Sequence, residues 1–363
     1  MSPSPEIGTR KHPKPMKTWS ETNFKDSMKN YHTYNEIKSQ TQAWAQALDI
    51  VNASSLPEAG DYDQVIFTGC GSTYYLSLAA EALYTELTGH SARAVPGGEL
   101  LLNSQTVLTN QKTLLVAISR SGTTTETVKA TEKFKAEKRG DVAVISNYNE
   151  VLSRMADFNF VIDKGQEESV AQTRSFASMY VAVTALCAKM AGRDDLLSSM
   201  SGLPKVGEIL IAKYEAYAKV VGENLNFDRF YFLGSGIRYG LDCEVNLKMK
   251  EMTLTHSEPF HFLEFRHGPM SMVNENAVVV GMLSDANQVH EAKVLSEMKM
   301  LGGTVAAFGE SEADVCFESR IPESIRSVLY LPVIQLMAFY RSLAKGLNPD
   351  RPTNLTAVVK LDL

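Results

Sequence analysis

Residues 65–87, VIFTGCGSTYYLSLAAEALYTEL, occur a second time in altered form at residues 230–252, FYFLGSGIRYGLDCEVNLKMKEM. Each copy begins with a short apolar run typical of a buried strand, turns at a Gly-x-Gly sequence and continues as a long helix. Laid side by side without a gap, the copies place identical residues together, among them Phe67 with Phe232, Gly69 with Gly234, Gly71 with Gly236, Tyr74 with Tyr239 and Glu86 with Glu251. The chain therefore contains an internal repeat.

The repeat extends beyond the first helix. The segment TLLVAISRSG…GDVAVISN has a looser partner in AVVVGMLSDANQ…GGTVAAFGES, and both indicate strand, loop, helix, glycine and strand. Strands that alternate with helices form βαβ units, so their sheets are parallel and covered by helices on both faces. We therefore predict an α/β fold made of two doubly wound parallel-sheet domains, each an α/β/α sandwich, in tandem.

The domain boundaries follow from the repeat and from composition. Residues 1–44 hold a predicted mobile arm rich in Pro, Lys and Ser, followed by the start of a helix. We place the first domain at residues 45–200 and the second at residues 215–345, since 363 residues leave room for two domains of ordinary size. The closing residues 346–363 form a tail, which we expect either to return to the active site or to pack along the surface.

Composition excludes several classes of function. The formal net charge of −6 argues against a nucleic-acid partner, which needs a basic face. No apolar run approaches 18 residues and the chain starts without the apolar core of a secretory signal, so we expect a cytoplasmic protein with no membrane partner. The four cysteines lack Cys-x-x-Cys spacing, which is typical of single buried thiols. No histidine has a His or Cys partner at i+4, and we predict neither a metal nor another cofactor.

Polar side chains gather where the next apolar run gives way to a helix. The chain there reads Ser119, Arg120, Ser121, Gly122, Thr123, Thr124, Thr125. In an open parallel sheet, ligands bind beyond the carboxyl ends of the strands, and a helix N-terminus at that place suits a tetrahedral oxyanion. A helix cap would need one or two hydroxyl groups, but this loop has five. We therefore predict an anion site, in which hydroxyl groups donate hydrogen bonds and the arginine supplies charge.

Two other uses of a glycine-rich turn do not fit this sequence. The turn TGCGSTYY has Tyr74 in place of the third glycine of a dinucleotide fingerprint, and no acidic residue ends the next strand. No Gly-Lys-Ser/Thr sequence follows any glycine-rich loop, as a Walker A motif requires. We interpret Ser72 and Thr73 as further donors to the same anion. The second repeat has LSDANQ in place of the hydroxyl-rich loop, so we expect one anion site per chain.

Five motifs, in this order, resemble those of the sugar isomerase (SIS) domain family: GCGSTYYLSLAAEAL, AISRSGTTTET, ESVAQTRSF, GSGIRYGLDCEVNLKMKE and LEFRHGPMSMV. Over residues 45–363 the chain is similar to a tandem pair of SIS domains, such as the isomerase half of glucosamine-6-phosphate synthase. It resembles still more the stand-alone isomerases and isomerising deaminases of sugar phosphates. These motifs are specific for the family and unspecific for the substrate.

The resemblance implies roles for individual residues. Arg120 stands where the synthase has Gln, as in the stand-alone enzymes, and Gln172 stands where the family more often has Ser. The synthase carries a tail lysine after an Asn-Leu pair, at a position where this chain has Ala357, with Lys360 three residues later. The family's anion cradle falls on Thr73, Ser119, Ser121 and Thr124.

The resemblance also implies the catalytic groups. Glu251 matches the catalytic base, Lys248 a neighbouring site lysine, and His267 a histidine associated with ring opening that reaches the partner subunit's site. Lys248 lies one helical turn before Glu251, so it faces the same side and can either lower the pKa of the base or stabilise an enediolate oxygen. From the spacing alone, Glu251 is equally well a solvated glutamate paired with Lys248.

Residues 258–271, EPFHFLEFRHGPMS, suggest a second copy of the chain. Their three phenylalanines are too apolar to lie free in solvent, so we expect this loop to cross to the partner of a homodimer with shared active sites. Within the loop, Glu264 and Arg266 either orient His267 or pair with each other.

Taken together, the motifs indicate an aldose–ketose isomerase of a hexose with an anionic group at C6, in which one carboxylate serves C1 and C2 of a cis-enediol. Phosphate is the commonest such anion, and a sulfonate has nearly the same shape. The closest alternative is an isomerising deaminase of an amino-sugar phosphate. A non-catalytic sugar-phosphate sensor is a second alternative, although such regulators usually have one SIS copy behind a helix-turn-helix.

Overall fold

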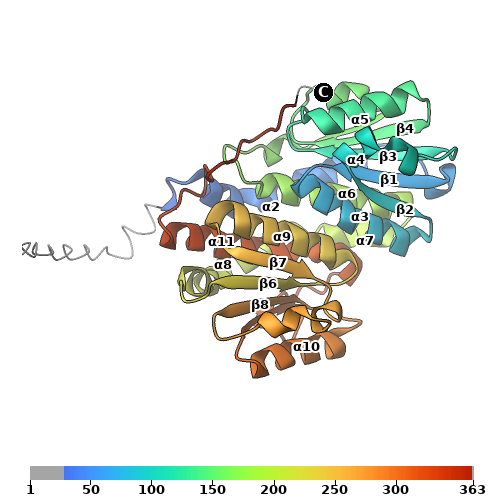
Figure 1. The fold of residues 1–363 in the computed structure, drawn as a ribbon. Helices are drawn as coiled ribbons and strands as arrows, with labels where there is room; N and C mark the ends of the chain where they lie inside the picture. Colours follow the sequence, from blue (N-terminus) through green and yellow to red (C-terminus); the bar gives the residue numbers. More distant parts are fainter. Residues whose placement is uncertain (1–27, 362–363) are drawn as a thin grey trace, which may run out of the picture.

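The computed structural model describes residues 28–361 and contains two five-stranded parallel sheets (Figure 1). The predicted arm at the start of the chain lies outside the described residues. The first sheet has the order β2-β1-β3-β4-β5 and the second the order β7-β6-β8-β9-β10. The strands are β1 (Gln64–Gly69), β2 (Ala92–Pro96), β3 (Thr113–Ser119), β4 (Gly140–Ser146), β5 (Phe158–Val161), β6 (Arg229–Leu233), β7 (His256–Phe260), β8 (Ala277–Met282), β9 (Thr304–Gly309) and β10 (Val315–Cys316).

The two sheets repeat one topology. Strand β6 takes in the second sheet the place that β1 takes in the first, and β7 to β10 follow as β2 to β5 do. Strands β1, β3 and β8 are buried over their whole length, as strands covered on both faces must be. The predicted α/β class, with two doubly wound parallel sheets in tandem, is confirmed.

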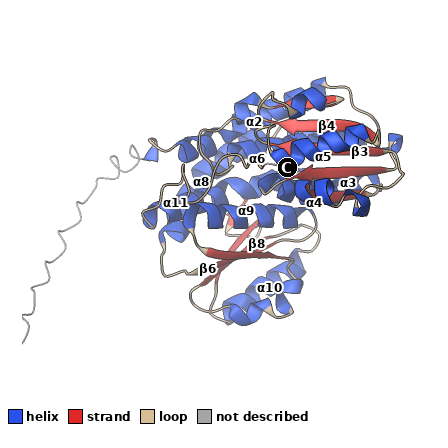
Figure 2. Ribbon diagram, turned by 45° about the horizontal axis from the view of Figure 1, so that its top comes forward, coloured by secondary structure: helices blue, strands red, loops and turns tan. Residues whose placement is uncertain are grey.

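Helices cover both faces of each sheet (Figures 1 and 2). Helices α4 and α5 pack on the outer face of the first sheet, and α10 packs on the outer face of the second. The other long helices pack together on the inner faces. The helices are α2 (His32–Ala53), α3 (Ser72–Thr88), α4 (Gly97–Leu102), α5 (Thr125–Ala136), α6 (Arg174–Met190), α7 (Asp194–Met200), α8 (Leu203–Glu223), α9 (Ile237–Thr253), α10 (Gln288–Met300) and α11 (Leu331–Ala344).

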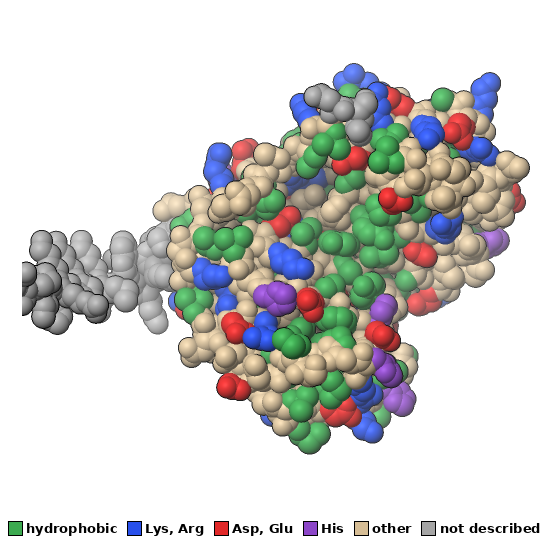
Figure 3. Space-filling view, viewed as in Figure 1, with side chains coloured by type: hydrophobic (Ala, Val, Ile, Leu, Met, Phe, Trp, Pro, Cys, Tyr) green, Lys and Arg blue, Asp and Glu red, His purple; other side chains and the backbone are tan. Residues whose placement is uncertain are grey.

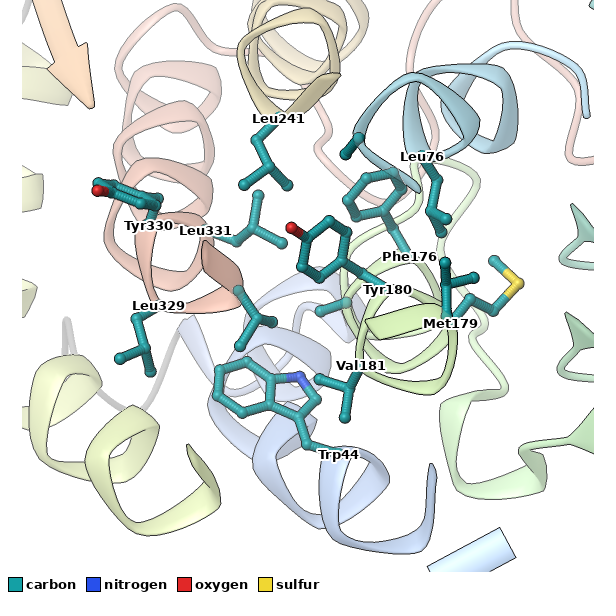
Figure 4. Packing of buried hydrophobic residues seen from close by; sticks show 14 of the residues in the cluster. Trp44, Leu76, Phe176, Met179, Tyr180, Val181, Leu241, Leu329, Tyr330 and Leu331 are labelled. Atoms are coloured by element: carbon teal, nitrogen blue, oxygen red, sulfur yellow. The ribbon is translucent and has the colours of Figure 1, made fainter. Parts of the chain in front are cut away.

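One apolar core reaches both sheets. In Figure 4, Trp44 of α2, Tyr180 of α6 and Leu241 of α9 point toward one another, with Tyr330 and Leu331 beside them. The segment Ser327–Ala344 has the length and mean hydropathy that a membrane span needs, but 89% of it is buried inside this core. Close packing of this kind holds the helices between the sheets in fixed positions.

The glycine turns of the two repeats have the same backbone. Gly71 has φ 57° and ψ −123°, and Gly236 has φ 59° and ψ −129°, a conformation that residues with a side chain rarely adopt. Each turn leads from β1 or β6 directly into a helix, α3 or α9. These two helices cross at Gly240, where a Cβ atom would lie 2.5 Å from the carbonyl oxygen of Tyr75. The repeat seen in the sequence is therefore a structural repeat.

Candidate active site

A cavity of about 170 Å³ lies where the first glycine turn, the start of α5, helix α9 and the C-terminal tail meet. The first two elements belong to the first sheet, and α9 follows the first strand of the second sheet, so both halves of the chain build the wall. Leu355 to Val359 of the tail close one side. Of the residues predicted for the site, the wall contains Ser72, Arg120, Thr124, Gln172, Lys248 and Glu251.

Three charged side chains occupy one face of α9. Glu244, Lys248 and Glu251 lie at helical spacings of four and three residues, so they follow one another along that face. The Lys248 ammonium group contacts the Glu251 carboxylate, lies 3.4 Å from Glu244 Oε1 and donates a hydrogen bond of 3.2 Å to Ser72 Oγ. Glu244 and Lys248 are almost fully buried, whereas the Glu251 side chain is 19% exposed. Glu251 is therefore the carboxylate that a ligand can reach.

Burial and neighbouring charges shift the pKa values of Glu244 and Lys248. Desolvation raises the pKa of Glu244 to about 8, against the smaller opposing effect of Lys248. For Lys248, burial lowers the pKa, but Glu244 and Glu251 act together in the other direction and the net pKa is raised. Lys248 thus stays an ammonium ion at neutral pH and remains a fixed positive charge beside Glu251.

The raised pKa of Glu244 predicts a pH dependence of folding. In the unfolded chain this carboxyl group titrates near 4.5, and in the folded chain near 8, so the folded state holds an extra proton between these values. Stability from this group is therefore complete below about pH 4.5 and is lost as the pH rises toward 8. Glu244→Gln imitates the protonated form. Its free energy of unfolding, relative to that of the wild type, should therefore increase by up to about 1.4 kcal/mol for each pH unit between these two values.

Urea unfolding at pH 5.5, 7.0 and 8.5 measures this difference. Glu208→Gln, an exposed glutamate on α8, is the matched control and should follow the wild type at every pH. Parallel stability curves for Glu244→Gln and the wild type would show that Glu244 has an ordinary pKa.

The hydroxyl-rich loop lies at the N-terminus of α5. Its N-cap residue, Thr124, lines the cavity and makes no side-chain capping bond. The Thr124 hydroxyl group lies 3.3 Å from the Oγ of Ser119, which is not part of the cavity wall. Ser119 Oγ also accepts a hydrogen bond of 3.1 Å from the backbone of Gly122. Simple helix capping therefore does not account for Thr124, whose hydroxyl group is available to a bound anion.

Ser121 faces a different hollow. Its Oγ accepts hydrogen bonds from the backbone and side chain of Thr123, at 3.2 and 3.1 Å. It lines a neighbouring cavity of about 290 Å³, which shares Arg120, Ala357 and Val358 with the first. The tail therefore separates Ser121 from the cavity that holds Glu251.

Arg120 holds the backbone of two segments together. Its guanidinium group donates hydrogen bonds to the carbonyl oxygens of Val170 and Ala357, at 2.8 and 2.6 Å, and lies 3.8 Å from Glu167. Leu361 N also donates a bond of 3.1 Å to Thr125 Oγ1, so the tail is fastened to α5 as well. Of the two expected courses, the tail takes the one that returns to the site. The hydrogen bond from Arg120 to Ala357 holds the tail at the site.

Thr73 and His267 lie away from the cavity wall. The Thr73 hydroxyl group bonds to the backbone N and O of Cys70, at 2.8 and 3.0 Å, and so fastens the glycine turn. His267 is exposed at the end of a short 3-10 helix, Glu264–Arg266. Their assignments to the anion and to a partner's site stay predictions.

The loop at residues 258–271 does not need a partner to cover its phenylalanines. Phe262 and Phe265 are buried in the core of their own domain, with 1% and 0% exposure, because the loop folds back against the outer face of the second sheet. The inference from apolarity was therefore wrong. Arg266 pairs with Glu297 through two bonds of 2.6 and 2.8 Å, so it neither orients His267 nor pairs with Glu264.

Two carboxylates of the site were missed in the sequence. Glu244 looks like any helix glutamate, and only its spacing of four residues before Lys248 gave a signal. Glu126, in the first turn of α5, lines the cavity, and its buried Oε2 has no hydrogen-bond partner among residues 28–361. In the same part of the chain, no three His, Cys, Asp or Glu side chains are arranged to hold a metal ion.

Part of the chain that builds this cavity matches a known protein family. Residues 61–189 match the family model of the SIS domain. Over 347 residues the chain is 28% identical to the glutamine–fructose-6-phosphate aminotransferase (isomerizing) of Pyrococcus horikoshii, covering 90% of this chain and 57% of that protein. The chain thus spans little more than half the length of the curated relatives it matches.

Solved structures agree with the fold over nearly the whole chain. The glucosamine-6-phosphate deaminase of Thermotoga maritima superposes with a TM-score of 0.78 at 26% identity, covering 91% of this chain and all (100%) of that one. The tagatose-6-phosphate ketose/aldose isomerase of Escherichia coli has the same fold, with a TM-score of 0.78 at 20% identity, covering 90% and 96%. Residues 61–189, which hold the first sheet, therefore match the SIS domain, and nearly the whole chain shares its fold with these solved structures.

Proposed function

We propose that the chain is an aldose–ketose isomerase of a hexose that carries an anionic group at C6. The observation that supports this most is the cavity itself, in which a reachable carboxylate, Glu251, lies with a buried ammonium group opposite a hydroxyl-bearing helix N-terminus. An anion bound at Thr124 would hold the far end of the sugar. Binding energy from that end can position C1 and C2 against the carboxylate.

The chemistry needs one base and one fixed positive charge. Glu251 would take the proton from C2 of the open-chain aldose and return it to C1, with a cis-enediol between the two steps. Lys248 would stabilise the developing negative charge on the enediol oxygen, because its ammonium group is buried and already oriented by Glu244 and Ser72. His267 of a partner subunit would open the ring.

A deuterium assay tests the reaction class. The full chain is incubated in deuterated water with hexoses that carry a phosphate or a sulfonate at C6, and exchange at C2 is followed by proton NMR. Exchange with one of these sugars and none with the uncharged hexose is the expected result. Absence of exchange with every sugar in the panel would overturn the proposal.

The likeness to the Thermotoga deaminase supports a second candidate, an isomerising deaminase of an amino-sugar phosphate. It uses the same proton transfer and then releases ammonia. Incubation with glucosamine 6-phosphate separates the two, since only the deaminase liberates ammonia.

Removing a hydroxyl group from the anion loop should weaken substrate binding. Thr124→Ala removes a donor from the cavity wall and should raise KM by about 10- to 100-fold, which corresponds to roughly 1–3 kcal/mol for one hydrogen bond to a charged group. Asn287→Ala is the matched control, because Asn287 is the N-cap residue of α10 as Thr124 is of α5. If the folded Thr124→Ala variant keeps its KM, the anion binds elsewhere.

A further inference from the structure

The second half of the chain has a cavity of its own at the place that corresponds, by the internal repeat, to the candidate active site. Its volume is about 460 Å³, within the range of small-molecule pockets. The second glycine turn and the loop before α10 line it, together with Glu86 of α3. Glu86 is the residue that the repeat pairs with Glu251.

Each cavity combines the glycine turn of one repeat with the glutamate of the other repeat. In the first, the glycine turn comes from the first repeat and the glutamate from the second. In the second, Ser235 and Gly236 belong to the second repeat and Glu86 to the first. The crossing of α3 and α9 therefore carries one glutamate into each cavity.

In the second cavity, a carboxylate of the protein lies at the position that corresponds to the predicted anion site of the first repeat. The backbone amides of Asp285 and Ala286, at the start of the loop before α10, donate hydrogen bonds of 2.9 and 3.3 Å to Glu323 Oε2. The other carboxylate oxygen of Glu323 pairs with Arg238. At the matching loop of the first repeat, the amides of Gly122 and Thr123 bond only to serine hydroxyl groups. A phosphate or sulfonate would meet the Glu323 carboxylate and be repelled.

Several polar groups around this cavity are left without partners. Arg238 is only 6% exposed, and its Nε has no hydrogen-bond partner within the described part of the chain. Asp242, fully buried beneath Gly234, has no partner there for either carboxylate oxygen. At the rim, the side chains of Asn287 and Ser324 make no hydrogen bond within residues 28–361 and can bond a ligand.

The charges at the cavity leave one carboxylate over. The residues that line the cavity carry one positive charge, on Arg238, and two negative charges, on Glu323 and Glu86, and Arg238 pairs with Glu323. Glu86 makes no ion pair within residues 28–361, and it lies at the mouth, where a ligand can reach it. A fitting ligand therefore carries hydroxyl groups and one positive charge, with no anion.

We propose that the second cavity binds an unphosphorylated amino sugar, whose ammonium group pairs with Glu86 and whose hydroxyl groups bond to Asn287 and Ser324. This site is independent of the activity proposed for the first cavity.

Isothermal titration of the full chain with D-glucosamine, in buffer with excess inorganic phosphate to occupy the first cavity, tests the proposal. We expect one site per chain, at least tenfold weaker binding in Glu86→Gln, and at least tenfold weaker binding of uncharged D-glucose to the wild type. Glu251→Gln, the matched variant in the first cavity, should bind D-glucosamine as the wild type does. Asn287→Ala should weaken binding as a second, independent change.

Three results would overturn the proposal. The first is no binding of D-glucosamine to the wild type. The second is equal affinity in Glu86→Gln and the wild type. The third is loss of binding in Glu251→Gln with retention in Glu86→Gln, which would place the amino sugar in the first cavity. Since Glu86 is exposed at the rim, its replacement should leave the fold intact, and the thermal unfolding midpoint checks this.

Discussion

Glu251→Gln is expected to lower the rate of C2 proton exchange by about 10²- to 10⁴-fold, the usual contribution of a positioned general base. Glutamine keeps the size and the helix propensity of glutamate but cannot accept the proton. Because the side chain is 19% exposed and Lys248 keeps Glu244 as a partner, the fold should survive the change. Deuterium exchange at C2 under saturating substrate measures the effect on kcat.

The internal repeat offers a matched control for this experiment. Glu86→Gln changes the corresponding glutamate of the first repeat, which lines the other cavity. It should leave the exchange rate at the wild-type value. A Glu251→Gln variant that retained exchange would mean that another group is the base, and Glu126, whose buried Oε2 faces no partner among the described residues, would be the next to change.

Two inactive variants are expected to restore each other if the sites are shared between subunits. His267→Ala and Glu251→Ala should each reduce activity to near background. After the two chains are unfolded and refolded together, a mixed dimer holds one intact site out of two, so random pairing restores about a quarter of the wild-type activity. The rate of C2 exchange in the mixture measures the recovery.

The exposed position of His267, away from its own chain's cavity wall, makes this prediction specific. Hydrophobic side chains also gather on the face of the molecule where α3 and α9 lie, as Figure 3 shows beside Figure 1. The control is refolding of each variant alone, which should recover nothing. Mixed dimers that form, as shown by differently tagged chains, and yet stay inactive would rule out a shared site.

The fold could be predicted because its signals are local and occur twice. A buried strand, a Gly-x-Gly turn and a helix recur at residues 65–87 and 230–252, and each turn needs backbone angles that favour glycine. Alternation of such units allows little besides parallel sheets with helices on both faces. The same helical spacing placed Lys248 and Glu251 on one face of α9, where the structure has them.

The site was harder to predict, because the direction in which a side chain points and the extent of its burial depend on segments far away in the chain. Arg120 was expected to supply charge to an anion, but its guanidinium group bonds to carbonyl oxygens at Val170 and at Ala357, 237 residues further along the chain. Thr73 was predicted as a donor to the anion, and in the structure its hydroxyl group bonds to the backbone of Cys70 in its own turn. In both cases the residue type was compatible with either partner.

The sequence by itself determined the two-sheet architecture, the hydroxyl-rich loop at the start of α5 and the Lys248–Glu251 pair, since periodicity and turn chemistry act over a few residues. Only the tertiary structure decided that Glu244 is buried with a pKa raised to about 8, that the tail divides Ser121 from the main cavity, and that Glu323 accepts hydrogen bonds from the loop before α10. Each of these depends on desolvation or on contacts between segments far apart in the chain, and such effects exist only once the two halves have packed together.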